Sequence, residues 1–515
     1  MHALVRSAAL TGVDAIEVSV EASIAGGLPG VHVVGLPDTA VREARERVRA
    51  ALRSARLTLP ASRVVVNLAP ADVRKEGPAF DLPIALALLA AQGRLPQARL
   101  RHATVVGELG LDGRVRPVRG VLALALAARS AGSTSMVLPA SQASELAAVA
   151  GVHAVPVASL ADAIAWARGA PNSGAAMDSG AAMDSGAATT YATIGLSGGG
   201  LADALDLQDV RGQLVAKRAL EVTAAGRHHL LLVGPPGGGK TMLARRLPPL
   251  LPPLTLDEAM AVARLHSLAG LARSPLERLP PLREPHHTVS LGGLLGSPTS
   301  LGELSLAHHG VLFLDELPEF DRRALEALRE PLEAGSLLLA RARSRQRLPA
   351  EVMLVASMNP CPCGHEGDPK RACSCLPSDR RRYLGRLSGP LLDRLALRVV
   401  VPALADEGGR VHSRAEASSA VAARVAAART LALERQGCAN AALRGASLVR
   451  YAAVPRSARA LLEAAQADGR LNERGLDDVR RVARTLADLV QRGAIELEDV
   501  AEALSYRAEL ARPGH

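Results

Sequence analysis

A strand-length apolar run that leads directly into a glycine-rich loop constrains this chain more than any other feature. Residues 229–233 read His-Leu-Leu-Leu-Val, residues 234–241 fit the pattern G-x-x-x-x-G-K-[ST], and an amphipathic stretch continues to Leu247. Strand, loop and helix in immediate succession predict backbone N–H groups that surround phosphates at the positive end of a helix. The alternative is a Gly/Pro turn between a strand and a helix.

We expect this loop to bind ATP together with Mg²⁺. Lys240 would reach the β- and γ-phosphates, and the Thr241 hydroxyl would hold the metal ion. The remaining predicted cofactor-binding residues of the loop supply backbone N–H groups and the turn itself: Gly234, Pro235, Pro236, Gly237, Gly238 and Gly239.

A second apolar run, residues 310–314, ends in Asp315 and Glu316. Ligands of an open parallel sheet lie at the carboxyl ends of its strands, so these acids are predicted to lie beside the phosphate loop. Asp315 would bind Mg²⁺ through water, and Glu316 would orient and deprotonate the attacking water. An apolar strand that ends in acids also occurs by chance.

A third run, residues 352–357, ends shortly before Asn359 and Pro360. Asn359 would hydrogen-bond the lytic water or the γ-phosphate, whereas the alternative is an ordinary Asn-Pro turn.

Four of the five cysteines lie within fifteen residues, which suggests a local thiol cluster in a reducing compartment and not a disulfide framework. Four thiolates can close a tetrahedral Zn²⁺ site, and His365 is an alternative ligand. The other interpretation is four reduced thiols in a loop. The candidate ligands are Cys361, Cys363, Cys373 and Cys375.

Length, charge and hydropathy limit the remaining possibilities. A chain of 515 residues is too long for one hydrophobic core. The formal charge of +10 suits a polyanionic partner if the excess is clustered, although an arginine-rich composition alone would also produce it. We found no uncharged apolar run of membrane-spanning length and no apolar leader, so we expect a cytoplasmic protein without a membrane partner.

Residues 1–168 are predicted to form an α/β domain, with strands such as 31–34 and 63–67 and helices such as 39–55 and 81–91. The phrases at 75–81, 105–113 and 117–120 resemble the Lon-type protease domain. That family needs a Ser nucleophile and a Lys that activates it, and these positions fall on Ala79 and Leu122. We therefore expect a Lon-like fold without protease activity.

Three further segments complete the expected layout. Residues 169–200 repeat Ser-Gly-Ala-Ala-Met-Asp and are predicted to be a flexible linker. Residues 201–402 are predicted to be a P-loop ATPase core with a parallel sheet. Residues 403–515 are expected to form a helical lid, in which residues 476–489 carry one apolar stripe.

This order of domains resembles the YifB/ComM family of magnesium-chelatase-like AAA+ ATPases over nearly the whole chain. The phrases that carry the resemblance are residues 285–288, 302–308, 310–320, 358–364, 388–394 and 482–489. The resemblance makes Asn359 a sensor 1 residue, Arg474 a sensor 2 arginine and Arg394 an arginine finger that enters a neighbouring subunit. The alternative for Arg394 is a surface pair with Asp393.

The resemblance implies a hexameric ring that hydrolyses ATP. It further implies a DNA-binding branch-migration or helicase-type factor in natural transformation or recombination, acting on branched or single-stranded DNA. A protein-complex remodeller like magnesium chelatase, not acting on DNA, is the alternative. A Lon-like protease is disfavoured because Ala79 and Leu122 cannot perform its chemistry.

Overall fold

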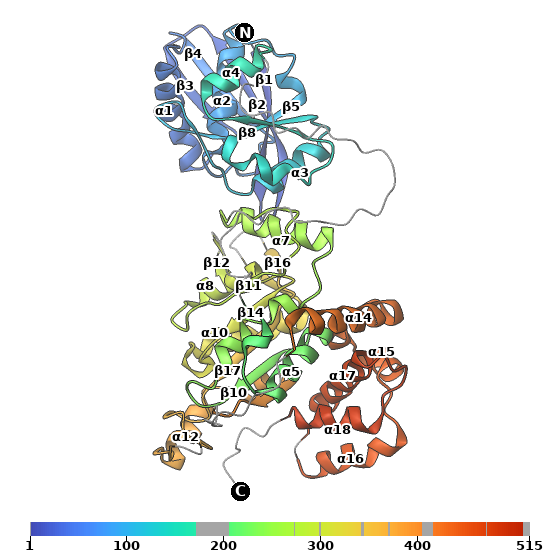
Figure 1. Cartoon of the computed structure of the whole chain (residues 1–515). Helices are drawn as coiled ribbons and strands as arrows, with labels where there is room; N and C mark the ends of the chain where they lie inside the picture. Colours follow the sequence, from blue (N-terminus) through green and yellow to red (C-terminus); the bar gives the residue numbers. More distant parts are fainter. Residues whose placement is uncertain are drawn as a thin grey trace. The chain divides into compact units, whose positions relative to one another are not determined.

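The computed structural model describes residues 2–170, 205–271, 273–297, 300–340, 345–368, 371–403, 416–469 and 471–507. Apart from its first two residues, the predicted linker lies outside them. The chain divides into two compact units. Figure 1 shows the chain coloured from blue at the N-terminus to red at the C-terminus. Unit 1 comprises Met1–Ile194 and Thr255–Arg278, and unit 2 comprises Gly195–Leu254 and Leu279–His515.

Unit 1 is built on a seven-stranded mixed sheet of order β3-β4-β2-β1-β5-β8-β9. Long antiparallel pairing of β1 with β2 and of β2 with β4 forms its centre, and the other neighbouring pairs are parallel. Its strands are β1 His2–Thr11, β2 Asp14–Ala25, β3 Gly30–Val34, β4 Arg63–Ala69, β5 Ala103–Val105, β8 Ser135–Pro139 and β9 His153–Val157, beside a hairpin of β6 Glu108–Leu109 and β7 Val115–Arg116.

Helices cover both faces of this sheet. Side chains of a strand alternate between the faces, so Val5 joins the core under α1 and α2, whereas Ala8 joins the cluster under α3. The helices of unit 1 are α1 Thr39–Ser54, α2 Asp81–Ala91, α3 Val121–Ser130, α4 Leu160–Ala167 and α7 Leu256–Leu268.

Helix α7 shows how the structure differs from the predicted domain borders, which kept residues 201–402 together. Ala263 of α7 is fully buried in the apolar cluster of unit 1. Gly120 donates its N–H to the carbonyl of Ser267 at 2.9 Å, and the Ser267 hydroxyl donates to the buried Glu145 carboxylate at 2.7 Å. Segment 255–278 therefore belongs to unit 1, although it lies between two parts of the ATPase core in the sequence.

Unit 2 contains a five-stranded sheet of order β11-β14-β17-β10-β18, in which all neighbouring strands are parallel. Strands β10, β14 and β17 are fully buried, which explains their uninterrupted apolar sequence. The strands are β10 Leu230–Val233, β11 Leu282–Arg283, β14 Val311–Leu314, β17 Met353–Met358 and β18 Leu397–Val400.

Short helices and two hairpins surround this sheet (Figure 1). The helices are α5 Leu214–Gly226, α6 Lys240–Ala244, α8 Leu291–Leu295, α9 Glu303–Leu306, α10 Arg322–Ala327, α11 Arg329–Ala334, α12 Pro377–Leu384 and α13 Gly389–Leu392. The hairpins are β12 Gly296–Ser297 with β13 Ser300–Leu301, and β15 Ser336–Ala340 with β16 Arg345–Pro349.

The C-terminal part of unit 2 is helical, as the sequence predicted. It consists of α14 Ser418–Gln436, α15 Gly445–Tyr451, α16 Arg456–Ala467, α17 Glu473–Leu489 and α18 Leu497–Ser505. The predicted apolar stripe of α17 is confirmed: Val479, Val482, Leu486 and Leu489 are buried in the core that α17 shares with α5 and α14, and Leu476 packs against it.

Candidate nucleotide site

The predicted phosphate loop follows β10 at the carboxyl edge of the sheet and runs into α6. Gly239 has φ of +86°, which a side chain would strain. A Cβ on Gly234 would lie 2.1 Å from the Val401 carbonyl oxygen, so only glycine fits there. The backbone turn therefore depends on glycine at both ends of the loop.

Lys240 lies almost completely buried at the start of α6. Its ammonium group donates hydrogen bonds to the carbonyls of Gly234 and Pro235 at 2.7 and 2.9 Å, and to the side-chain oxygen of Asn359 at 3.1 Å. Burial lowers the pKa of Lys240, whereas the nearby Asp315 and Glu316 raise it. The lysine is thus held within the loop, in contact with the residue predicted as sensor 1.

Thr241 and Asp315 form the predicted magnesium position. The Thr241 hydroxyl donates to one Asp315 oxygen at 2.6 Å, and the Ser357 hydroxyl donates to the other. A hydroxyl and a carboxylate are oxygen donors of the kind that Mg²⁺ accepts. The residues fit the ion, because Thr241 and Asp315 already share one hydrogen bond at the phosphate edge.

Ser357 is a site residue that the sequence reasoning missed. It lies on β17 with its hydroxyl on Asp315, although the whole strand is buried. The available signal was a hydroxyl residue in an otherwise apolar strand, since a buried polar group needs a partner.

Glu316 follows Asp315 with φ of +55°, a left-handed conformation that is uncommon outside glycine. Its side chain is 56% exposed, so it reaches solvent beside the phosphate loop, and His287 lies 3.7 Å from its carboxylate. A carboxylate exposed at this edge is free to contact a water molecule, which a general base requires.

The two predicted arginines lie at the other end of the sheet. The side chain of Arg394 donates to Glu333 at 2.6 Å, and Arg474 lies 3.7 Å from the same carboxylate. Burial, together with the nearby positive charges of Arg227, Arg474 and Arg394, lowers the pKa of His229 to about 4, so both predicted arginines lie near His229. Because His229 precedes β10, the arginine pair lies at the amino edge, opposite the phosphate loop.

Local contacts fix this arginine pair. Asn472 caps α17 and donates to Asp393 at 3.0 Å, which ties the start of α17 to the residue before Arg394. Asp393 pairs with Arg398 at 3.5 Å, and the acidic partner of Arg394 is Glu333. The alternative of a surface pair between Asp393 and Arg394 is therefore wrong. An open pocket of about 570 Å³ adjoins Arg394 and Glu333.

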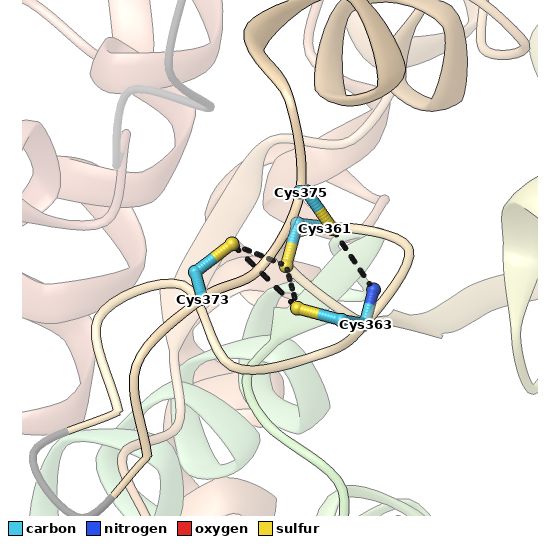
Figure 2. A group of neighbouring side chains, drawn as sticks. All are labelled: Cys361, Cys363, Cys373 and Cys375. Atoms are coloured by element: carbon cyan, nitrogen blue, oxygen red, sulfur yellow. Dashed lines mark hydrogen bonds between the residues drawn. The ribbon is translucent and has the colours of Figure 1, made fainter.

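The four clustered cysteines lie together in the loop after β17 (Figure 2). Their sulfur atoms all lie within 4.8 Å of one another, and none of these four cysteines forms a disulfide. This arrangement can hold a metal ion. His365, the alternative ligand, instead lies 3.2 Å from the Asp368 carboxylate.

In unit 1, the two positions aligned with protease chemistry lie in an apolar cluster. Leu122 is fully buried in this cluster, and the partly buried Ala79 packs against it. Met260 and Ala263 of α7 belong to the same cluster. These positions therefore contribute packing, and neither carries a group that could attack a peptide bond.

Comparisons with known proteins agree with this geometry. Residues 206–408 match the family model described as magnesium chelatase, subunit ChlI. Residues 20–142 match the model described as subunit ChlI of Mg-chelatase, and residues 415–507 match its C-terminal model. A parallel sheet with a phosphate loop, two acids and a helical lid defines the class, a magnesium-chelatase-like AAA+ fold, and this class indicates ATPase activity.

Full-length relatives specify the family further. A protein of Mycobacterium tuberculosis (strain ATCC 25618 / H37Rv) is 44% identical, with 98% of each chain covered. YifB of Salmonella typhimurium is 42% identical, and the competence protein ComM of Haemophilus influenzae is 40% identical; each comparison covers 98% of this chain and 97% of the relative. The chain belongs to the YifB/ComM family of magnesium-chelatase-like proteins.

A short part of the chain is also similar to a protein of a different class, a Lon protease. A Lon protease of Heliobacterium modesticaldum is 37% identical over 81 residues, which is 16% of this chain and 10% of that protein. Among the described residues, no helix combines the length and apolarity needed to cross a membrane.

Proposed function

We propose that the chain assembles into a hexameric ring that hydrolyses ATP and moves along DNA. The observation that carries the ring is the position of Arg394 and Arg474 at the edge opposite Lys240 and Glu316. Neither arginine contacts the phosphate loop of its own subunit, so each would act on ATP only in a neighbouring subunit. ATP and Mg²⁺ are the cofactors of this reaction, and Zn²⁺ would be a structural ion outside it.

In this mechanism each group has one task. Backbone N–H groups of residues 234–239 and the Lys240 ammonium group would bind the phosphates, and Thr241 and Asp315 would hold Mg²⁺, which stabilises the charge on the phosphates. Glu316 would take a proton from the attacking water, and the Asn359 amide would orient that water. The neighbour's Arg394 would stabilise the negative charge of the transition state.

DNA is the proposed substrate because the relative ComM is named a competence protein and this chain carries a net charge of +10. We assign the role of a branch-migration or helicase-type factor in natural transformation or recombination. Arg381 and Arg382 on α12 are exposed, and Arg382 pairs with Asp379 at 3.0 Å on the same helix, a surface pair that a phosphate could replace. Arg380 is paired with Glu366. A second basic pair is formed by Lys370 and Arg371 in the sequence, and Lys370 lies outside the described residues.

The ring is tested with mixed subunits. Arg394→Ala subunits and Glu316→Gln subunits should each be inactive alone, and mixing them should restore part of the ATPase activity, because some boundaries then contain both intact groups. Absence of restoration in rings shown to contain both variants would contradict a finger supplied by the neighbour.

The DNA activity is tested with a labelled four-way junction. Wild-type protein with ATP should convert the junction into duplex products, and the Glu316→Gln protein should not. The logarithm of affinity should fall with the logarithm of salt concentration by about 0.9 for each phosphate contacted. Replacing Arg381 and Arg382 with Ala should reduce this slope while basal hydrolysis continues.

The second candidate is a remodeller of protein complexes, favoured by the match to models described as magnesium chelatase subunit ChlI. A hydrolysing ring that neither binds nor converts any junction or fork would favour this candidate over the DNA motor. For unit 1, we propose a Lon-like fold without peptidase activity, supported by the local Lon similarity and by Ala79 and Leu122.

A further inference from the structure

The loop between β17 and α12 carries a compact group of sulfur atoms. The Cys361 and Cys363 sulfurs are 3.4 Å apart, and Cys373 lies 3.6 Å from both. The Cys375 sulfur accepts the Cys363 backbone N–H at 3.3 Å, which places it against the other three (Figure 2). Tetrahedral Zn–S bonds of about 2.3 Å separate ligand sulfurs by about 3.8 Å, close to these distances.

The described part of this loop has few apolar side chains that could hold its shape by packing. Between the two cysteine pairs, the described residues at 364–368, 371 and 372 are glycine, charged or small apart from His365. Such residues bury little apolar surface, so a metal cross-link between the cysteines would add substantially to the ordering of the loop. His365 is engaged with Asp368, which leaves four thiols as the ligand set.

The same loop contacts the nucleotide site. Gly364, one residue after Cys363, has φ of +82°, and a Cβ there would lie 2.6 Å from the ring of Pro236 in the phosphate loop. Asn359 lies two residues before Cys361 and accepts a hydrogen bond from Lys240. The cysteine loop is thus packed directly against the elements that would surround the phosphates.

Helix α12 follows the cysteine loop and also contacts Asn359. Its residue Tyr383 is buried and hydrogen-bonds the Asn359 backbone. Arg380 on the same helix pairs with Glu366 in the loop. Position 359 is therefore held by Lys240, by α12 and by the loop that the four thiols close.

We propose that Cys361, Cys363, Cys373 and Cys375 bind one structural Zn²⁺, and that this ion keeps Asn359 in the position needed for hydrolysis. The second part rests on the proposed ATPase function. Zn²⁺ would replace the thiol protons and draw the four sulfurs into one tetrahedron. Without the ion, the loop would lose its closure, Gly364 would leave Pro236, and Asn359 would lose its orientation, whereas residues 234–241 would still bind ATP.

The metal site is tested on the full-length protein by elemental analysis. Wild-type protein should contain one Zn per chain, and a Cys373→Ser/Cys375→Ser variant should contain none. Cys438→Ser is the matched control, because Cys438 is a free cysteine outside the cluster, and it should retain the metal. Folded wild-type protein without Zn, or with Zn that survives the double substitution, would overturn the site.

The coupling is tested by comparing hydrolysis with binding of a fluorescent ADP analogue. The double serine variant should lose about 10²-fold in kcat, the effect of a misplaced catalytic group, with little change in nucleotide affinity. Gly364→Val leaves all four thiols but inserts a side chain against Pro236. It should therefore retain Zn and still show reduced kcat.

The outcomes separate the two proposals. Loss of Zn with unchanged kcat in the serine variant would overturn the coupling and leave the metal site. If wild-type rings bind nucleotide but do not hydrolyse it, the proposed ATPase function fails. The metal content and the protection of residues 359–376 from proteolysis would then still decide the zinc site.

Discussion

The nucleotide site of unit 2 and the apolar cluster of unit 1 both contain positions that the sequence analysis compared with catalytic residues, yet their compositions are opposite. In unit 2, Lys240 is buried at the phosphate edge, where desolvation lowers its pKa, and it lies near the carboxylates of Asp315 and Glu316. In unit 1, Ala79 and Leu122 are apolar and pack with α7. The side chains at these positions thus suit catalysis in unit 2 and packing in unit 1.

The largest expected effect is a loss of hydrolysis in the nucleotide site of unit 2. Glu316→Gln removes the proposed base and leaves the phosphate loop unchanged, so kcat should fall by about 10²–10⁴-fold. ATP binding and thermal stability should stay near wild type, because the side chain is 56% exposed. Single-turnover hydrolysis and nucleotide titration measure the two quantities, and equal rates for variant and wild type would exclude Glu316 as the base.

The next largest effect concerns the stability of the apolar cluster in unit 1. Leu122→Lys would place an unpaired charge in the apolar cluster, which should lower the free energy of unfolding by about 3–5 kcal/mol. No peptidase activity should appear, because Ala79 has no hydroxyl group. Leu111→Lys is the control, since Leu111 is 65% exposed in the same unit. Equal unfolding midpoints in denaturant for both variants would break the comparison.

Lys240→Ala should affect binding more than folding. The ammonium group would make charge-assisted hydrogen bonds worth about 1.5–3 kcal/mol, so ATP affinity should fall by about 10²-fold. Its partners within the subunit include two backbone carbonyls, so the thermal midpoint should change little. A variant that binds ATP as tightly as wild type would remove Lys240 from the site.

The smallest effect concerns Glu145, which holds α7 through Ser267. Burial raises the pKa of Glu145 above the usual 4.5, opposed by hydrogen bonds from Ser267 and Gln142. A raised pKa in the folded state means that this carboxyl stabilises unit 1 most below pH 4.5 and progressively less as the pH rises through the folded-state pKa.

Glu145→Gln should therefore raise the midpoint of thermal unfolding at pH 7 by about 2 °C and leave it unchanged near pH 4. Scanning calorimetry at both pH values measures this difference. The exposed substitution Glu43→Gln is the control. A lower midpoint for Glu145→Gln at pH 7 would show that the ionised carboxylate stabilises the contact with α7.

The sequence predicted the parts of the molecule that local patterns encode. Buried strands of unit 2 appear as continuous apolar runs, and the residues that follow them were placed at one edge because parallel strands align their carboxyl ends. The contacts of Arg394 and Arg474 with the Glu333 carboxylate could not be predicted from local patterns, since each contact joins residues that are 61 or more positions apart in the sequence. Helix α7 was also missed, because a mixed helical pattern does not reveal which core it joins.

The placement of α7 makes unit 1 a discontinuous domain, with consequences for how the chain is divided experimentally. A fragment ending at residue 168 would lack Met260 and Ala263 and would expose part of its own core, so aggregation of that fragment would say nothing about the intact protein. Conversely, a single cut engineered between residues 171 and 204 should release no free N-terminal piece. The two products should elute together until denaturant detaches α7.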